Sequence, residues 1–393
     1  MDPIRNPFSP GAGTPPPELA GRDELLSAAR VAIARARAGR PAKSKILVGL
    51  RGVGKTVLLE RIRLDAEREG AMTIFLEAQA ERSLPALLAP QLRLALLRLS
   101  QLDSARALAV RGLRALAGFA RRLKINFADI EVGVDFEPEP GLADNGDFEQ
   151  DLAVLISQIG EAAKAAQTVL VILFDELQYV PSAQLAPLIS ALHRSEQLCL
   201  PLVLVGAGMP SLRAQMGNAR TYAERLFDFP MVDALNPEFA RLAVIKPLNA
   251  QAVDITQEAI EQILEQTRGY PYFLQLWASY AWLAAEHSPI DMACIQRASA
   301  AAIAALDESF FRLRFDRLTE RERLYLQTMA ILGPAPHRSG DIAAQLGVDV
   351  SKLAPIRSAL IAKGMIWSPS HGLTAFTVPM FDEFMLRILP KGP

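Results

Sequence analysis

The chain has 393 residues, half of them hydrophobic and 22% charged, which is the composition of a globular protein with sizeable cores. Its net charge of −1 excludes a global positive field that would draw it onto nucleic acid, so any DNA contact must come from a local patch. The two cysteines, Cys199 and Cys294, and the four scattered histidines lack metal-type or redox spacing, which argues against a zinc site.

Residues 1–18 are rich in proline and glycine, and we expect them to form a disordered tail. They lack the basic-then-apolar order of a signal peptide, and no apolar run of the chain is long enough to cross a bilayer as a helix. A cytoplasmic protein without a membrane partner is therefore expected. Length suggests two or three domains.

Residues 19–235 read as an α/β domain. A helix that ends near Gly39 precedes the apolar strand KILVGL, a glycine-rich loop, a helix that ends at Gly70, and the strand AMTIFLEAQ. Two more apolar runs, TVLVILF and LPLVLVGAG, follow later with a helix between them, and FDFPMVDALN suits a short fifth strand. Alternating strands and helices are typical of a parallel sheet flanked by helices.

An insert is expected at about residues 83–140. Its first part is helical and rich in Leu, Ala and Arg, and its arginines form either a solvated helical face or a contact for DNA or a partner. Its second part alternates with period two around residues 130–137, which predicts a short hairpin or an edge strand.

The character of the chain changes after Asn236. Residues 236–315 read as helices without strands, which predicts a helical lid domain. Residues 316–393 read as three helices and a hairpin that turns near Gly372, which is the order of a winged helix-turn-helix domain.

Residues 49–56, GLRGVGKT, match the phosphate-binding pattern G-x-x-x-x-G-K-[ST] between a strand and a helix. Glycines let backbone N–H groups approach an anion, and the helix N-terminus adds partial positive charge. Lys55 is expected to reach the β and γ phosphates of ATP, and the Thr56 hydroxyl to bind Mg²⁺. The expected nucleotide-binding residues are Gly49, Leu50, Arg51, Gly52, Val53, Gly54, Lys55, Thr56 and Val57.

The strand VLVILF ends abruptly in Asp175 and Glu176. Ligands of open α/β sheets bind at the carboxyl ends of the strands. We therefore expect Asp175 to hold the Mg²⁺ shell together with Thr56, and Glu176 to orient or activate the attacking water. The alternative is that Asp175 and Glu176 follow the strand simply because a loop begins there. The glycine-rich loop at residues 49–56 is the reason to prefer a functional role.

Together, the glycine-rich loop, FDELQ and VLVGAG resemble an AAA+ ATPase, and more narrowly the origin-recognition-complex-like and STAND-like bacterial ATPases. The resemblance extends from Gly21 to the C-terminus. It implies that GRDEL lies beside the adenine, that RGYPYFLQ belongs to the lid with a Gly-x-Pro, and that GDIAAQLGVDVSKLAPIRSALIAKGMIW is a winged helix.

The resemblance also implies an arginine finger in the segment TYAERLFDFPMVDALNPE. Such a residue neutralises charge on the γ-phosphate in the transition state, often from a neighbouring subunit. Arg225 is the first candidate and Arg220 the second. The alternative is that Arg225 forms a surface ion pair with Glu224 or another carboxylate. A finger in trans would require a nucleotide-dependent homo-oligomer.

Two positions depart from the AAA+ pattern. The fourth strand runs into small residues, Gly206 to Gly208, where the family usually has a polar residue that senses the γ-phosphate, and Ser211 is the nearest substitute. The lid has Pro271 where many members have an arginine, although Arg268 is nearby. Both departures favour a slow nucleotide switch over a fast motor.

Two function hypotheses follow. In the first, the chain is a slow ATPase that couples its nucleotide state to double-stranded DNA through Lys352 and Arg357 of the winged helix, with weak, salt-sensitive binding. In the second, it is a STAND-like signalling or defence ATPase whose winged helix is an autoinhibitory or protein-binding module. A remodeller is a third reading, against which the lack of a pore-loop pattern counts.

Overall fold

The computed structural model describes residues 1–11, 13–79, 81–123, 136–370 and 372–388. The chain forms two compact units. The sheet unit consists of Arg22–Gly49 and Lys55–Val232, and the helical unit consists of Met1–Gly21, Leu50–Gly54 and Asp233–Pro393. Among the described residues, no helix combines the length and the apolar character needed to span a membrane.

The sheet unit is built on five parallel strands in the order β2-β3-β4-β1-β5. Their bounds are β1 (Ser44–Val48), β2 (Met72–Glu77), β3 (Leu170–Asp175), β4 (Leu202–Gly208) and β5 (Phe227–Asp228). Every residue of β3 and β4 is buried, because helices cover both faces of the sheet. The α/β fold expected from the sequence is confirmed.

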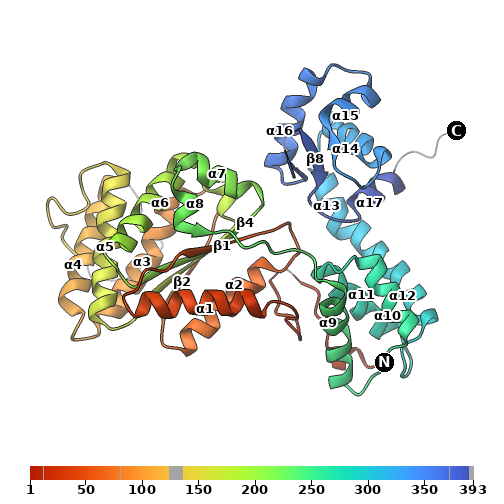
Figure 1. Ribbon diagram of the computed structural model, residues 1–393, viewed down its shortest axis with the longest axis horizontal. Coiled ribbons are helices and arrows are strands. Elements are labelled where there is room, and N and C mark those ends of the chain that lie inside the picture. Colours follow the sequence, from red (N-terminus) through yellow and green to blue (C-terminus); the bar gives the residue numbers. More distant parts are fainter. Residues whose placement is uncertain (12, 80, 124–135, 371, 389–393) are drawn as a thin grey trace. The chain divides into compact units, whose positions relative to one another are not determined.

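Helices lie on both faces of this sheet. The helices of the sheet unit are α1 (Asp23–Arg37), α2 (Lys55–Arg68), α3 (Leu84–Ser100), α4 (Arg106–Arg122), α5 (Phe148–Ala165), α6 (Ser182–Gln197), α7 (Ser211–Ala219) and α8 (Ala223–Leu226). The crossovers β1–α2–β2 and β3–α6–β4 run in opposite directions along the sheet, so right-handed connections put α2 and α6 on opposite faces, as Figure 1 shows.

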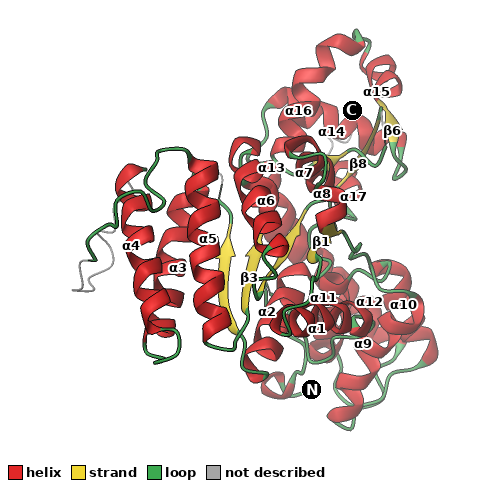
Figure 2. Cartoon of the chain, turned by 60° about the vertical axis from the view of Figure 1, so that its left-hand side comes forward, coloured by secondary structure: helices red, strands yellow, loops and turns green. Residues whose placement is uncertain are grey.

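The predicted insert appears as the helices α3 and α4. Figure 2 shows them beside α5, and both α3–α4 and α4–α5 pack together. The hairpin or edge strand predicted around residues 130–137 lies almost entirely outside the described residues.

The first part of the helical unit is a bundle of four helices, α9 (Pro237–Ala250), α10 (Gln257–Thr267), α11 (Pro271–Ala284) and α12 (Met292–Ala305). Three of them begin at a side chain that caps the helix: Asn236, Thr256 and Asp291 each accept a backbone N–H of the first turn. A π-helical turn, Leu306–Phe311, joins α12 to α13 (Arg312–Phe315).

The last part of the chain, which we call the C-terminal module (residues 316–388), combines helices with a small antiparallel sheet. Its helices are α14 (Glu320–Leu332), α15 (Ser339–Leu346), α16 (Ala354–Ala362) and α17 (Phe381–Arg387), and its strands β6 (His337–Arg338), β7 (Ile366–Trp367) and β8 (Leu373–Phe376) pair in the order β6-β8-β7. The three predicted helices and the hairpin are present. The strand β6 and the helix α17 were not predicted.

The first residues of the chain pack against α11, in contrast to the disordered tail expected from their composition. The Trp282 indole donates a hydrogen bond to the Asp2 carbonyl over 2.8 Å, and the Asn6 amide donates one to the Ser279 hydroxyl over 3.0 Å. Phe8 is only 4% exposed. These partners on α11 fix the segment, and they are distant in sequence, so composition alone does not reveal them.

Candidate active site

The glycine-rich loop connects β1 directly to α2, as the motif requires. Gly52 and Gly54 have φ angles of 82° and 93°, a region that side chains disfavour, so the loop depends on glycine at both positions. The backbone N–H of Gly49 donates to the Gly208 carbonyl over 3.1 Å, which fixes the start of the loop beside the end of β4.

Lys55 is the first residue of α2, and only 6% of it is exposed. Its Nζ donates a hydrogen bond to the Gly49 carbonyl over 2.9 Å, so the side chain folds back across the start of the loop. The ammonium group therefore lies at a helix N-terminus, where the helix dipole also favours an anion. Val57 follows in the same turn of α2.

Thr56 and Asp175 meet although 119 residues separate them in the chain. The Thr56 hydroxyl donates a hydrogen bond of 2.6 Å to Asp175 Oδ2. Asp175 is the last residue of β3 and is 3% exposed. Burial raises the pKa of the Asp175 carboxyl above its ordinary value, and the hydrogen bond from Thr56 opposes part of that rise.

A hydroxyl and a carboxylate are hard oxygen donors of the kind that Mg²⁺ prefers, and in phosphate-binding loops the remaining ligands come from phosphate and water. Among the described residues, no group of three or more His, Cys, Asp and Glu side chains forms a metal site of its own. The pair Thr56 and Asp175 thus fits a magnesium ion that arrives with a nucleotide better than a resident metal ion.

Glu176 directly follows β3 and turns the chain away from the sheet. It has a positive φ of 54°, and its backbone N–H donates to Asp175 Oδ1 over 2.8 Å. Its side-chain carboxylate accepts a hydrogen bond from the amide of Gln178. Sequence reasoning assigned no role to Gln178, although its position in FDELQ, three residues after Asp175, was the available signal.

The end of β4 carries no polar side chain, since the strand finishes with Gly206, Ala207 and Gly208. Ser211, the substitute considered from the sequence, is an exposed residue that begins α7.

The two candidate arginine fingers differ in their surroundings. Arg220 forms an ion pair with Glu149 and donates from Nε to the Ser190 hydroxyl over 3.2 Å. Arg225 lies on the short helix α8 and is exposed. No ion pair or hydrogen bond joins its side chain to Glu224 or to any other residue that the structure describes. The geometry thus leaves Arg225 available for a substrate or a partner, whereas Arg220 is engaged.

The Gly-x-Pro of the lid lies where α11 begins. Pro271 is the first residue of α11, and Tyr270 before it donates a hydrogen bond from its hydroxyl to the Arg51 carbonyl within the helical unit. Burial raises the pKa of the Tyr270 hydroxyl. Arg268 forms an ion pair of 3.1 Å with Glu383 of α17.

The two candidate DNA contacts are also placed differently. Lys352 is exposed in the turn before α16. Arg357 lies on α16, and its guanidinium donates to Thr374 Oγ1 over 3.0 Å and to Ser368 Oγ over 2.9 Å. Arg357 thus ties the β7–β8 hairpin to α16. The sequence pattern could not distinguish this internal use from a contact with phosphate.

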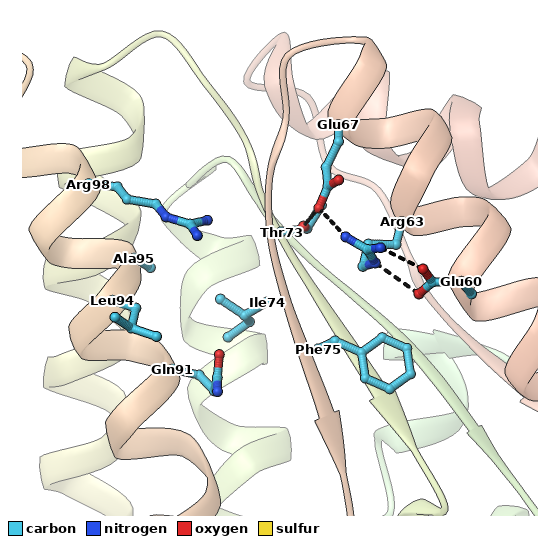
Figure 3. A pocket seen from close by; sticks show the side chains of 10 residues that line it. All are labelled: Glu60, Arg63, Glu67, Thr73, Ile74, Phe75, Gln91, Leu94, Ala95 and Arg98. Carbon is cyan, nitrogen blue, oxygen red and sulfur yellow. Dashed lines mark hydrogen bonds and ion pairs between the residues drawn. The ribbon is translucent and has the colours of Figure 1, made fainter. Parts of the chain in front are cut away.

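A separate hollow of about 260 Å³ lies between α2, β2 and α3 (Figure 3). Several of its polar side chains bind one another. Arg63 forms ion pairs with both Glu60 and Glu67, and the Thr73 hydroxyl donates a hydrogen bond to Glu67. None of the residues of the glycine-rich loop lines it. The hollow is therefore separate from the glycine-rich loop.

Two families match the chain by sequence. Residues 18–205 match the family described as "AAA ATPase domain", and residues 308–385 match the family described as "Domain of unknown function (DUF8462)". No curated protein matches the chain.

Among solved structures, the chain is similar to the Walker-type ATPase of Pyrococcus abyssi, with 16% identity, a TM-score of 0.57, and coverage of 94% of this chain and 96% of that one. Cdc6p of Pyrobaculum aerophilum has 14% identity, a TM-score of 0.48 and coverage of 98% and 97%. Orc1 of Aeropyrum pernix, in complex with DNA, has 14% identity, a TM-score of 0.45 and coverage of 95% and 94%. The first likeness shows a common fold, and the family match covers the glycine-rich loop and the end of β3. Residues 18–205 of the chain therefore form an ATPase domain of the AAA family.

Proposed function

We propose that the chain is a nucleotide switch that binds ATP with Mg²⁺ at the loop 49–56 and hydrolyses it slowly. The observation that carries this proposal is the 2.6 Å hydrogen bond between Thr56 and Asp175, which joins the loop to the end of β3. A hydroxyl and a carboxylate held together in this way form the protein half of a magnesium shell.

In this proposal, the loop amides and Lys55 bind the phosphates, while Thr56 and Asp175 hold the magnesium ion, which would neutralise charge on the phosphate oxygens. Glu176 accepts a proton from the attacking water as the water oxygen bonds to the γ-phosphorus. The bond from phosphorus to the β–γ bridging oxygen breaks, which leaves ADP and phosphate.

Two features support slow hydrolysis. The small residues at the end of β4 offer no side chain to the γ-phosphate. Arg225 is exposed and has no side-chain partner among the residues that the structure describes, so it is suited to act in trans, on the nucleotide of a second copy of the chain. A lone subunit would then lack one of the groups that stabilise the transition state, and a nucleotide-dependent homo-oligomer would supply it.

Replacing Lys55 tests the nucleotide site. Lys55→Ala should weaken binding of a fluorescent ATP analogue at least tenfold, because the loop loses its only lysine. Lys164→Ala removes an exposed lysine from the end of α5 and should leave the affinity unchanged. If Lys55→Ala binds the analogue as tightly as the unaltered protein, the site is wrongly assigned.

For the C-terminal module we propose a winged helix, because three helices precede a β-hairpin there. Coupling to double-stranded DNA is the first version of its role, and Lys352 is an exposed cation in the turn before α16. This version predicts gel shifts with duplex DNA at low salt that depend on ATP and weaken in Lys352→Glu.

A second version has support from the hydrogen bonds of the module. Arg357 is engaged with the hairpin, and Lys363 pairs with Glu322 over 2.6 Å, so two cations of the region 352–363 serve the module itself. This favours a protein-binding or autoinhibitory role. Protein that is purified with bound ADP, and that fails to shift duplex DNA at low salt with or without ATP, would support this version and contradict the first.

A further inference from the structure

We propose that Gln178 is a positioning residue for hydrolysis. Its side-chain amide holds the Glu176 carboxylate and also binds the backbone directly after β4. This inference rests on the proposed ATPase reaction at the same site, and it concerns a residue that belongs to neither the glycine-rich loop nor the pair of carboxylates.

The hydrogen bonds of Gln178 fix the direction of its amide. The backbone N–H of Met209, directly after β4, donates to Gln178 Oε1 over 3.0 Å. Because a backbone N–H is only a donor, Oε1 must face Met209, and Nε2 is left to face Glu176. Gln178 Nε2 donates to Glu176 Oε2. One side chain therefore links the carboxyl end of β3 to the carboxyl end of β4.

The small residues of β4 make room for this link. A Cβ atom on Gly208 would lie 2.8 Å from Gln178 Oε1, and a Cβ atom on Gly206 would lie 2.3 Å from a methyl group of Leu177. Any larger residue at either position would displace the turn Leu177–Tyr179 or its side chains. Gly206 and Gly208 therefore leave the space that the side chains of Leu177 and Gln178 occupy.

The link has a consequence for the proposed base. The hydrogen bond from Nε2 restricts Glu176 to one orientation and leaves its other oxygen, Oε1, for water. Loss of the donor should therefore slow the chemical step without weakening nucleotide binding, since neither contact of Gln178 is with the glycine-rich loop.

Gln178→Glu removes the donor to Glu176 but keeps the acceptor for the Met209 N–H. Glutamate has the same shape and can still accept the Met209 N–H, but it cannot donate to Glu176 when ionised. We expect kcat for ATP hydrolysis to fall about ten- to a hundredfold, while the dissociation constant for a non-hydrolysable ATP analogue stays within about twofold of that of the unaltered protein. Gln178→Leu should lose the same activity and should also lower the melting temperature, because the Met209 N–H loses its acceptor.

Gln184→Glu is the matched control. Gln184 also accepts a backbone N–H through Oε1, from Leu84 over 2.7 Å, but it does not touch Glu176. Its kcat should remain unchanged. If Gln178→Glu hydrolyses ATP as fast as the unaltered protein, the positioning role is overturned while the proposed function stands. If the unaltered protein neither binds nor hydrolyses ATP with Mg²⁺, both are overturned.

Discussion

At the residue scale, Asp175 carries an electrostatic cost of burial that its hydrogen bond from Thr56 offsets only in part. Its carboxyl is buried at the end of β3, and burial raises its pKa above the ordinary value of 3.8. A carboxyl whose pKa is higher in the folded than in the unfolded chain destabilises the fold at every pH above its folded pKa, because the charged form is better solvated when unfolded. The residue is therefore placed for function at some expense of stability.

Asp175→Asn tests this trade-off. The substitution removes the buried charge. The amide oxygen can accept the Glu176 N–H while the amide nitrogen donates to the Thr56 hydroxyl, so we expect the nucleotide-free protein to melt about 1–3 °C higher at pH 7. The gain should diminish at acidic pH, where the native carboxyl is protonated. Stabilisation by ATP with Mg²⁺ should be lost. Thermal melts with and without nucleotide measure both effects, and an unchanged response to ATP with Mg²⁺ would contradict the assignment.

The sequence predicts residues at this scale when local pattern and chemistry coincide. GLRGVGKT identifies Lys55 and Thr56 by spacing alone, and an apolar run that stops at an aspartate identifies Asp175. Gln178 and Arg357 escape such reasoning, because their roles depend on partners at Met209 and Thr374. No local spacing encodes those partners.

At the scale of elements, α14 begins with a capping box that is tied to α16. The Thr319 hydroxyl accepts the Glu322 N–H, and the Glu322 carboxylate accepts the Thr319 N–H over 2.8 Å. Lys363, directly after α16, pairs with the same carboxylate. Burial of Glu322 acts to raise its pKa, but the hydrogen bonds from Lys363 and Thr319 outweigh it, so the pKa is lowered from 4.5.

Removing this cation should destabilise the C-terminal module. Lys363→Met leaves the buried Glu322 with fewer donors, and we expect a loss of about 1–3 kcal/mol in the free energy of unfolding at pH 7. Because the pKa of Glu322 is lower in the folded chain, its ionisation contributes stability at pH values above the unfolded value of 4.5. This stability is lost as the pH falls from 4.5 through the lower folded pKa. The difference between variant and unaltered protein should therefore shrink in acid. Urea denaturation across pH measures it.

Arg321→Met is the control for this prediction, because it removes an exposed cation from α14, the helix that contains Glu322. It should cost less than about 0.5 kcal/mol. Equal losses in the two variants would indicate that general charge, not the Glu322 pair, is responsible.

Elements with a clear period were predictable, and short ones were not. The strands β3 and β4 have six and seven residues, all of them apolar or glycine except Asp175, and such runs suffice for recognition. The strand β6 has two residues and depends on pairing with β8, so no period reveals it. The packing of the first residues of the chain escapes prediction for a related reason, because it depends on Ser279 and Trp282 of α11.

At the scale of the whole molecule, the exposed Arg225 predicts that activity depends on assembly. If it completes the site of a second copy, hydrolysis per subunit should rise with protein concentration, because a finger in trans exists only in the oligomer. Arg225→Ala should abolish this rise and reduce the limiting rate at least tenfold, with ATP affinity unchanged.

Arg194→Ala, which removes an exposed arginine from α6, is the control and should keep the concentration dependence. Steady-state hydrolysis measured over a range of protein concentrations, together with light scattering in the presence of an ATP analogue, checks the prediction. A rate per subunit that is constant with concentration and insensitive to Arg225→Ala would mean that the arginine has another role.

The central claim is that Thr56 and Asp175 together hold the magnesium ion of bound ATP, and titration of a fluorescent ATP analogue with and without Mg²⁺ tests it most directly. Thr56→Val keeps the shape of the side chain but removes its oxygen. We predict that Mg²⁺ tightens binding to the unaltered protein at least tenfold and that this gain disappears in Thr56→Val and in Asp175→Asn. A gain from Mg²⁺ that persists undiminished in both variants would contradict the account.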